Sequence, residues 1–174
     1  SAPAGRKIAG AAESPAGPVP GENMTRLAIA RAGTAEASRL AALHRACFAE
    51  GWDTPSIARL ISGPGGFALI ASDRRRDVGF ALLQCVPPES ELLSIGVVPG
   101  LRRAGIGQAL LARAAGDLLA VGAETMFLDV AADNQPAIAL YRARGFGDMS
   151  RRARYYSNGV DAIVMRAALT DIVV

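Results

Sequence analysis

Two arginines and two glycines, Arg102, Arg103, Gly105 and Gly107, lie between a predicted buried strand and a predicted helix. A helix that opens at such a loop presents backbone N–H groups without intrahelical partners, and its dipole places positive charge at the same point. The arginines add charge, and glycine lets the backbone approach a ligand without a Cβ in the way. The pattern therefore predicts a site for a pyrophosphate group.

The glycine spacing matches neither common nucleotide-binding fingerprint. A P-loop requires Lys followed by Ser or Thr after its last glycine, whereas Gln108 and Ala109 stand at those positions. A dinucleotide-binding fold requires a full GxGxxG run, and only GxG is present here. On these residues alone, a tight turn with exposed arginines remains the alternative to a pyrophosphate site.

A second block of motifs lies downstream. It reads FLDVAADNQPAIALYRARGF over 127–146 and predicts a strand, a loop, a helix and the start of another strand. Together the two blocks resemble the GNAT superfamily of acetyl-CoA-dependent N-acetyltransferases. The first is similar to that family's Arg/Gln-x-x-Gly-x-Gly loop, at Arg102, Gly105 and Gly107. The second is similar to its Asn-x-x-Ala-x-x-x-Tyr-x-x-x-Gly-Phe pattern, at Asn134, Ala137, Tyr141, Gly145 and Phe146.

Length and composition fit one globular domain. Of the 174 residues, 51% are hydrophobic and 20% charged, which is enough apolar material for a substantial core. No apolar run reaches the ~18 residues of a membrane span. The chain does not begin with the apolar stretch of a signal peptide, so we expect a cytoplasmic protein that does not associate with membranes. The net charge of +3 is modest, and aromatic residues are too few to interleave with arginines as nucleic-acid binding requires.

The cysteines and the single histidine do not form a metal-site pattern. Cys47 and Cys85 lie in a predicted helix and a predicted strand, and we expect both to be reduced thiols in the core. His44 lies three residues before Cys47, but two ligands with no second cluster do not make a zinc site. We therefore expect no metal.

The chain divides into a short extension and one domain. Residues 1–23 are rich in Ala, Gly and Pro, which predicts a flexible extension or a cloning remnant, with Met24 as a candidate natural start. The acetyltransferase domain is expected over 24–174. Within it, a cap at Thr34 and a Thr54-Pro55 start predict the first two helices.

The elements of this domain follow from hydrophobic periodicity and turn residues. Strands are predicted over 25–31, 67–72, 78–86, 91–98, 125–130, 146–156 and 160–168, and helices over 34–49, 54–63, 105–121 and 135–144. This order is that of the GNAT fold. The resemblance implies an α/β fold whose mixed, mostly antiparallel sheet is splayed between its fourth and fifth strands and flanked by helices.

The resemblance also implies where acetyl-CoA binds. In this family the pantetheine arm lies in the gap beside the splayed strand and pairs with its backbone. Pantetheine contacts are thereby implied for the main chain of Ile95, Gly96 and Val97, and for Asn134. Pyrophosphate contacts are implied for the loop that contains Arg102, Arg103, Ala104, Gly105, Ile106, Gly107 and Gln108.

Within the superfamily the chain most resembles the RimI family, bacterial enzymes that acetylate the N-terminal alanine of a small-subunit ribosomal protein. The resemblance rests on the LLSIGV-x-P strand and on the tail RARYYSNGVDAIVM. It implies a protein N-terminus as acceptor, with Trp52, Tyr155 and Tyr156 beside it. A small amine (polyamine, amino acid or aminoglycoside) is the alternative acceptor, and a non-catalytic acyl-CoA-binding regulator is a third hypothesis. We expect a monomer.

Acetylation of an amine requires a base for the incoming ammonium and an acid for the departing thiolate. The resemblance implies that Tyr141 is the acid. Asp129 is expected to be the base, since the enteric RimI pattern has a glutamate at this position, twelve residues before the tyrosine. Aspartate is one methylene shorter, so a bridging water is an alternative to direct contact. Glu91 is the backup base. Regular alternation would place it on the same face as Ile95 and Val97, unless the bulge typical of this family shifts the parity.

Overall fold

The computed structural model describes residues 26–173, so the extension predicted over 1–23 lies outside the described residues. Seven strands form one sheet in the order β1-β2-β3-β4-β5-β7-β6. All neighbouring strands are antiparallel except β4 and β5, which are parallel. The elements in chain order are β1 (Leu27–Ala32), the 3-10 helix η1 (Thr34–Glu36), α1 (Ala37–Cys47), α2 (Thr54–Ser62), β2 (Gly66–Asp73), β3 (Arg76–Val86), β4 (Glu89–Val97), α3 (Ile106–Ala120), β5 (Thr125–Ala131), α4 (Gln135–Ala143), β6 (Gly147–Arg152), β7 (Ala162–Ala168) and α5 (Leu169–Ile172).

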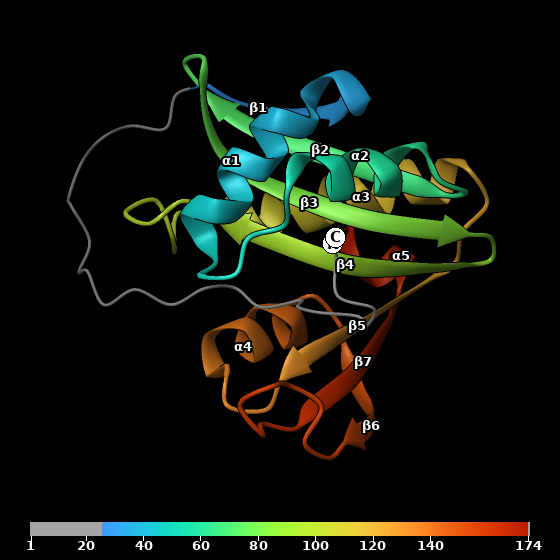
Figure 1. Ribbon diagram of the computed structural model, residues 1–174. Helices are drawn as coiled ribbons and strands as arrows, with labels where there is room; N and C mark the ends of the chain where they lie inside the picture. Colours follow the sequence, from blue (N-terminus) through green and yellow to red (C-terminus); the bar gives the residue numbers. More distant parts are fainter. Residues whose placement is uncertain (1–25, 174) are drawn as a thin grey trace.

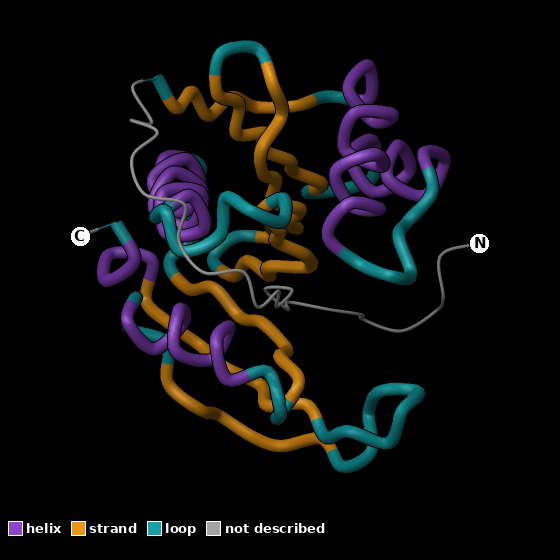
Figure 2. The backbone as a smooth tube through the Cα atoms, turned by 90° about the vertical axis from the view of Figure 1, so that its left-hand side faces the viewer, coloured by secondary structure: helices purple, strands orange, loops and turns teal. Residues whose placement is uncertain are grey.

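Helices cover both faces of the sheet. α1 and α2 lie over one face of the first four strands and α3 lies over the other, while α4 lies beside β5 and β7 (Figure 1). Figure 2 shows the strands running between helices on two sides. The α1 side is filled by a cluster that includes Leu40, Ile57 and Phe80. The α3 side is filled by a larger cluster that extends to Tyr141 of α4. No helix in residues 26–173 is long and apolar enough to span a membrane.

The predicted fold class and the order of the predicted elements are confirmed, and the differences lie at helix starts, in one strand and in one additional helix. α2 is capped by Asp53 and not by Thr54, because the Asp53 carboxylate accepts the Ser56 backbone N–H at 2.8 Å. Thr34 does not cap a helix either: it is the first residue of η1, whose N-cap is Gly33. The short C-terminal helix α5 was not predicted from the sequence.

The strand predicted over 146–156 is shorter in the structure. β6 ends at Arg152, and Arg154 adopts φ 49°, outside the extended region. Tyr155 and Tyr156 therefore lie in the loop that connects β6 to β7. That loop carries two of the residues predicted on the acceptor side.

The sheet is splayed at the predicted position. β4 pairs with β5 only over four residue pairs, from Glu89 opposite Thr125 to Leu92 opposite Leu128. Beyond Leu92, β4 continues to Val97 and remains paired with β3 alone. Among the described strands, none pairs with the edge of residues 94–97 that faces β5. This edge offers backbone donors and acceptors to a ligand.

A bulge lies where β4 leaves β5, and it changes which side chains share a face. The β3–β4 register shifts between Leu82 and Leu83, which leaves Leu93 without an opposite residue. Leu92 and Ile95 both belong to the core on the α3 side, whereas Leu93 packs with the cluster on the α1 side. Glu91 therefore lies on the opposite face from Ile95, and the face predicted from regular alternation is wrong.

Candidate active site

The predicted pyrophosphate loop connects β4 to α3 and contains three residues in the left-handed region. Gly100, Arg103 and Gly105 have φ of 91°, 66° and 82°. Gly105 is the N-cap of α3, and its carbonyl accepts the first intrahelical bond, from the Ala109 N–H at 3.0 Å. The helix thus begins at Ile106, one residue later than predicted. Its first N–H groups point out of the helix end toward the loop.

The side chains of this loop differ in what they can offer a ligand. A Cβ at Gly105 would meet nothing within 4 Å, and one at Gly107 would meet only Leu140 of α4, at 3.5 Å. Ile106 is buried in the core, so only its backbone N–H is available. Arg103 and Ala104 are exposed. The loop thus leaves space beside the backbone of Gly105 and Gly107, and a ligand needs this space to reach backbone N–H donors.

Two long polar side chains of this region make contacts within the protein. Arg102 donates from Nε to the Val97 carbonyl at 3.0 Å, which ties the loop to the end of β4. It also opposes the rise that burial causes in the pKa of the Cys47 thiol. Gln108 accepts a hydrogen bond from Arg144 at 3.0 Å, which links the start of α3 to the end of α4.

The strand edge predicted to bind pantetheine is held close to α1. A Cβ at Gly96 would lie 2.7 Å from the Phe80 ring and 2.9 Å from the Cys47 sulfur, so only glycine fits there. Ile95 is buried. Because the side chains are engaged in packing, only the main chain of these residues is available to a ligand in the gap. Asn134 lies across the gap, where its side-chain oxygen caps α4 by accepting the Ala137 N–H at 3.2 Å.

Tyr141 is completely buried on the inner face of α4. Its ring packs edge-on against Phe146, with ring centroids 5.7 Å apart. Its hydroxyl has no hydrogen-bond partner among residues 26–173. Burial, and secondarily the neighbouring Tyr156, raises the pKa of this phenol far above its ordinary value. The hydroxyl therefore stays protonated at neutral pH and can act only as a proton donor.

Asp129 lies on β5 and is 6% exposed. Its carboxylate is 3.9 Å from Nε of Arg152, at the end of β6. Burial raises the pKa of Tyr156, and the charge of Asp129 raises it further. Asp129 of β5 and Tyr141 of α4 are thus each close enough to Tyr156 of the β6–β7 loop to interact with it electrostatically.

Glu91, the backup base, is farther from this group. It lies opposite Phe127 within the paired part of β4 and β5, before the two strands diverge. Asp129 is therefore better placed than Glu91 to reach a group in the gap.

The residues predicted on the acceptor side come from two loops. Trp52 precedes α2 and is half-buried. Tyr155 and Tyr156 pack edge-on, with centroids 5.2 Å apart, and the Arg152 guanidinium lies 5.5 Å from the Tyr155 ring. Asp161 accepts a hydrogen bond from Arg151 at 2.7 Å and thereby braces the same loop.

His44 is a residue whose contacts sequence reasoning did not anticipate. It is fully buried, and burial lowers its pKa to about 4. Among residues 26–173 no group of three potential ligands could hold a metal ion, and both described cysteines are free thiols. Sequence offered one signal: a histidine on a helix face otherwise lined by apolar residues such as Leu40, Leu43 and Cys47.

Because His44 is the only histidine in the chain, its titration should be visible in the pH dependence of stability. The folded-state pKa of about 4 lies below the unfolded value of 6.5. Between these values the unfolded chain takes up a proton that the folded chain does not. The free energy of unfolding should thus be highest above pH 6.5 and fall by about 3 kcal/mol as the pH drops to 4.

Urea denaturation of the native chain and of His44→Gln at pH 7 and pH 4.5 measures this contribution. The native chain should lose more stability than the variant across this interval. Equal losses would show that His44 does not titrate in this way.

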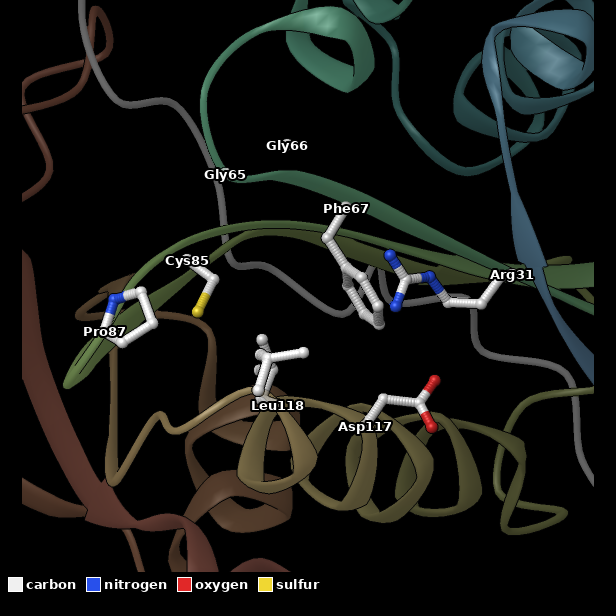
Figure 3. Close-up of a pocket in the computed structure, with 9 residues that line it drawn as sticks. Arg31, Gly65, Gly66, Phe67, Cys85, Pro87, Asp117 and Leu118 are labelled. Atoms are coloured by element: carbon white, nitrogen blue, oxygen red, sulfur yellow. The ribbon is translucent and has the colours of Figure 1, made fainter.

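A separate pocket of about 240 Å³ lies near the C-terminal end of α3. Arg31 lies over the Phe67 ring at 3.7 Å, and Asp117 and Leu118 approach from α3 (Figure 3). The pyrophosphate loop is at the other end of this helix. This pocket therefore does not belong to the site described above.

Comparison with known proteins agrees with this geometry. The acetyltransferase (GNAT) family profile matches residues 37–146, which is more than half of the chain. A [ribosomal protein bS18]-alanine N-acetyltransferase of Salmonella typhimurium is 39% identical over 100 residues, which are 56% of this chain and 66% of that protein. The chain thus matches slightly less than two thirds of the length of that relative.

Two further relatives align over most of their length. The N-alpha-acetyltransferase RimI of Mycobacterium tuberculosis is 35% identical over 139 residues, 76% of this chain and 86% of that protein. The crystal structure of the ribosomal-protein-S18-alanine N-acetyltransferase from Escherichia coli superposes with a TM-score of 0.77 and 29% identity, covering 83% of this chain and 94% of that one.

Proposed function

Since the chain belongs to the GNAT family of acetyltransferases, we propose that it transfers an acetyl group from acetyl-CoA to the N-terminal amine of a protein. One observation carries this proposal. The gap between β4 and β5 has an unpaired backbone edge on one side and a buried carboxylate and a protonated phenol, Asp129 and Tyr141, on the other. A thioester in the gap and an amine beside it would each have a proton-transfer partner.

The binding of acetyl-CoA is supported by the residues on both ends of the gap. We assign the backbone of residues 94–97 to the pantetheine arm and the N–H groups at the start of α3 to the pyrophosphate. The open space at Gly105 and the separation of Gly107 from Leu140 fit a phosphate chain that passes between α3 and α4. When bound, acetyl-CoA supplies an activated acyl group with a thiolate as leaving group.

Asp129 and Tyr141 would move the two protons. Asp129 accepts a proton from the acceptor ammonium, directly or through a water, and the free amine then attacks the thioester carbonyl. As the C–N bond forms and the C–S bond breaks, Tyr141 gives its proton to the sulfur, and the second proton that the nitrogen loses on becoming an amide restores the phenol. Because burial raises the pKa of Tyr141, the phenol keeps its proton at neutral pH and has it available for the departing thiolate.

The acceptor class rests on the relatives and on the two aromatic loops. The three relatives carry names of N-terminal acetyltransferases, two of them specific for alanine of a small-subunit ribosomal protein. Trp52 and the tyrosine pair Tyr155–Tyr156 would form opposite sides of a groove for an extended N-terminus. We further propose that the protein acts as a cytoplasmic monomer.

A thiol-release assay with acetyl-CoA tests the proposal. Acceptors are a peptide that begins with alanine and resembles the ribosomal protein's N-terminus, and a panel of polyamines, amino acids and an aminoglycoside. We expect turnover with the peptide. Turnover confined to the small amines would overturn the acceptor assignment, and binding of acetyl-CoA without any turnover would favour a regulator.

Asp129→Asn tests the base. The substitution keeps the size of the side chain and removes its charge, so kcat/KM for the acceptor should fall about tenfold at pH 7. The fall is smaller than for loss of the acid because a water can still relay the proton. Asp129→Glu, with the residue of the enteric pattern, should stay close to the native rate.

Asp148→Asn is the matched control. Asp148 is also an aspartate paired with an arginine, Arg142 at 3.1 Å, but it is exposed and lies outside the gap. The Asp148→Asn variant should acetylate the acceptor at the same initial rate as the native protein. A native rate for Asp129→Asn would transfer the role of base to Glu91 or to solvent.

A further inference from the structure

The side chain of His44 is enclosed by three aromatic rings. Its ring centroid is 4.8 Å from that of Phe48, 5.2 Å from that of Trp52 and 5.3 Å from that of Phe80. The imidazole and the Trp52 indole are nearly parallel, with 19° between their planes. A histidine in such surroundings is costly unless both of its ring nitrogens have hydrogen-bond partners.

Both nitrogens of His44 do have partners, and these fix the tautomer. The backbone N–H of Trp52 donates to Nδ1 at 3.1 Å, so Nδ1 must carry a lone pair. The neutral ring then carries its proton on Nε2, which is 3.1 Å from the hydroxyl of Ser94. Nε2–H therefore donates to this oxygen. Ser94 is fully buried and has no contact with solvent.

The two partners of His44 lie on the two sides of the proposed reaction. Trp52 belongs to the loop between α1 and α2, on the acceptor side. Ser94 follows the unmatched Leu93 directly, at the bulge where β4 turns away from β5. One neutral imidazole thus connects the acceptor loop to the point at which the gap for acetyl-CoA opens.

We propose that His44 is a positioning residue that sets the acceptor loop at Trp52 relative to the bulged edge of β4. This inference rests on the proposed function, in which that loop and that edge hold the acceptor and the thioester. His44 touches neither reactant. It acts by holding the backbone N–H of Trp52 and the hydroxyl of Ser94 at opposite ends of one rigid ring.

Simple packing predicts a different response to mutation. If His44 only filled space among aromatic rings, phenylalanine would replace it at no cost to activity. Phenylalanine in fact leaves the Trp52 N–H and the Ser94 hydroxyl without their partner. Glutamine offers one donor and one acceptor on neighbouring atoms, as the imidazole does, and can replace both bonds.

The test compares His44→Phe, His44→Gln and Ser94→Ala, with Ser90→Ala as the matched control. Ser90 is a buried serine of the same strand, and it donates to the Thr125 carbonyl at 2.9 Å in the part of β4 that stays paired with β5. Each variant is examined for acceptor KM, kcat and the Kd of acetyl-CoA. Urea denaturation shows that each variant is folded.

We expect Ser94→Ala, which loses one hydrogen bond, to raise the acceptor KM about tenfold, and His44→Phe, which loses two, to raise it at least as much. The Kd of acetyl-CoA should change less than about twofold in His44→Phe, since His44 touches neither reactant. His44→Gln should restore the KM to near the native value, and Ser90→Ala should lose stability without a change in KM. A native KM for folded His44→Phe would overturn the proposal.

Fluorescence provides a readout that does not depend on the acceptor. Trp52 is the only tryptophan of the chain, so its emission and its quenching by acrylamide report on this loop alone. His44→Phe should increase the quenching, and His44→Gln should not. If the native protein acetylates no peptide, the proposed acceptor is wrong, while unchanged quenching in His44→Phe would show that His44 does not hold the loop.

Discussion

Replacing Tyr141 with phenylalanine should lower the turnover of acetyl-CoA about 100-fold, the effect of losing a general acid. The affinity for acetyl-CoA should barely change, because the ring remains packed against Phe146. The native hydroxyl is buried and has no partner among the described residues, so its removal breaks no hydrogen bond. The variant should thus be at least as stable as the native protein.

The diagnostic result is this combination of lost turnover and retained stability. Thiol release gives kcat, calorimetry gives the Kd, and urea denaturation gives the free energy of unfolding. Tyr156→Phe is the matched control, since Tyr156 is a half-buried tyrosine whose hydroxyl is also buried and has no partner among residues 26–173. It should retain a kcat well above that of Tyr141→Phe. A parallel loss of binding in Tyr141→Phe would mean that Tyr141 is a packing residue.

Replacing Gly107 with valine should abolish the binding of acetyl-CoA. A Cβ at this position already lies 3.5 Å from Leu140, so the two methyl groups of valine would occupy the space between α3 and α4. This is the space that we assign to the pyrophosphate. Calorimetric titration with CoA measures the effect, and normal binding by a folded variant would refute the assignment.

Two alanine variants separate this steric effect from a change in helix stability. Gly107→Ala adds only the Cβ, at an ordinary contact distance, and should bind CoA more tightly than the valine variant. Gly116→Ala lies in the same helix, where its Cβ would meet Val173 at 3.7 Å, far from the loop. It should raise stability by about 0.5–1 kcal/mol and leave CoA binding unchanged.

The elements that sequence predicted well depend on local patterns. The loop before α3 and the helix of Tyr141 were found because glycine, arginine and capping residues recur at fixed short spacing. The splay of the sheet was implied by the resemblance and is confirmed by the four residue pairs that join β4 to β5. In the loop before α3 and in α4, the residues that form each motif are close together in the sequence.

The errors arose where a single residue interrupts a regular pattern. The bulge at Leu93 moves Glu91 to the opposite face from Ile95, and periodicity cannot locate a bulge. Arg154 ends β6 by adopting a left-handed φ, which sequence does not require of an arginine. The hydrogen-bond partners of His44 could not be predicted, since they are 8 and 50 residues away in the sequence.

The four-pair junction between β4 and β5 has a consequence for how the protein responds to its supply of acetyl-CoA. β4 has eight paired positions with β3, and β5 has seven with β7, so this junction is the weakest line across the sheet. A ligand that bridges the line stabilises the folded state by about 2.7 kcal/mol at a concentration one hundred times its Kd. Depletion of acetyl-CoA would then do more than slow the reaction. It would loosen the segment from β5 to β7 first, and so shorten the lifetime of the protein in a cell that lacks the substrate.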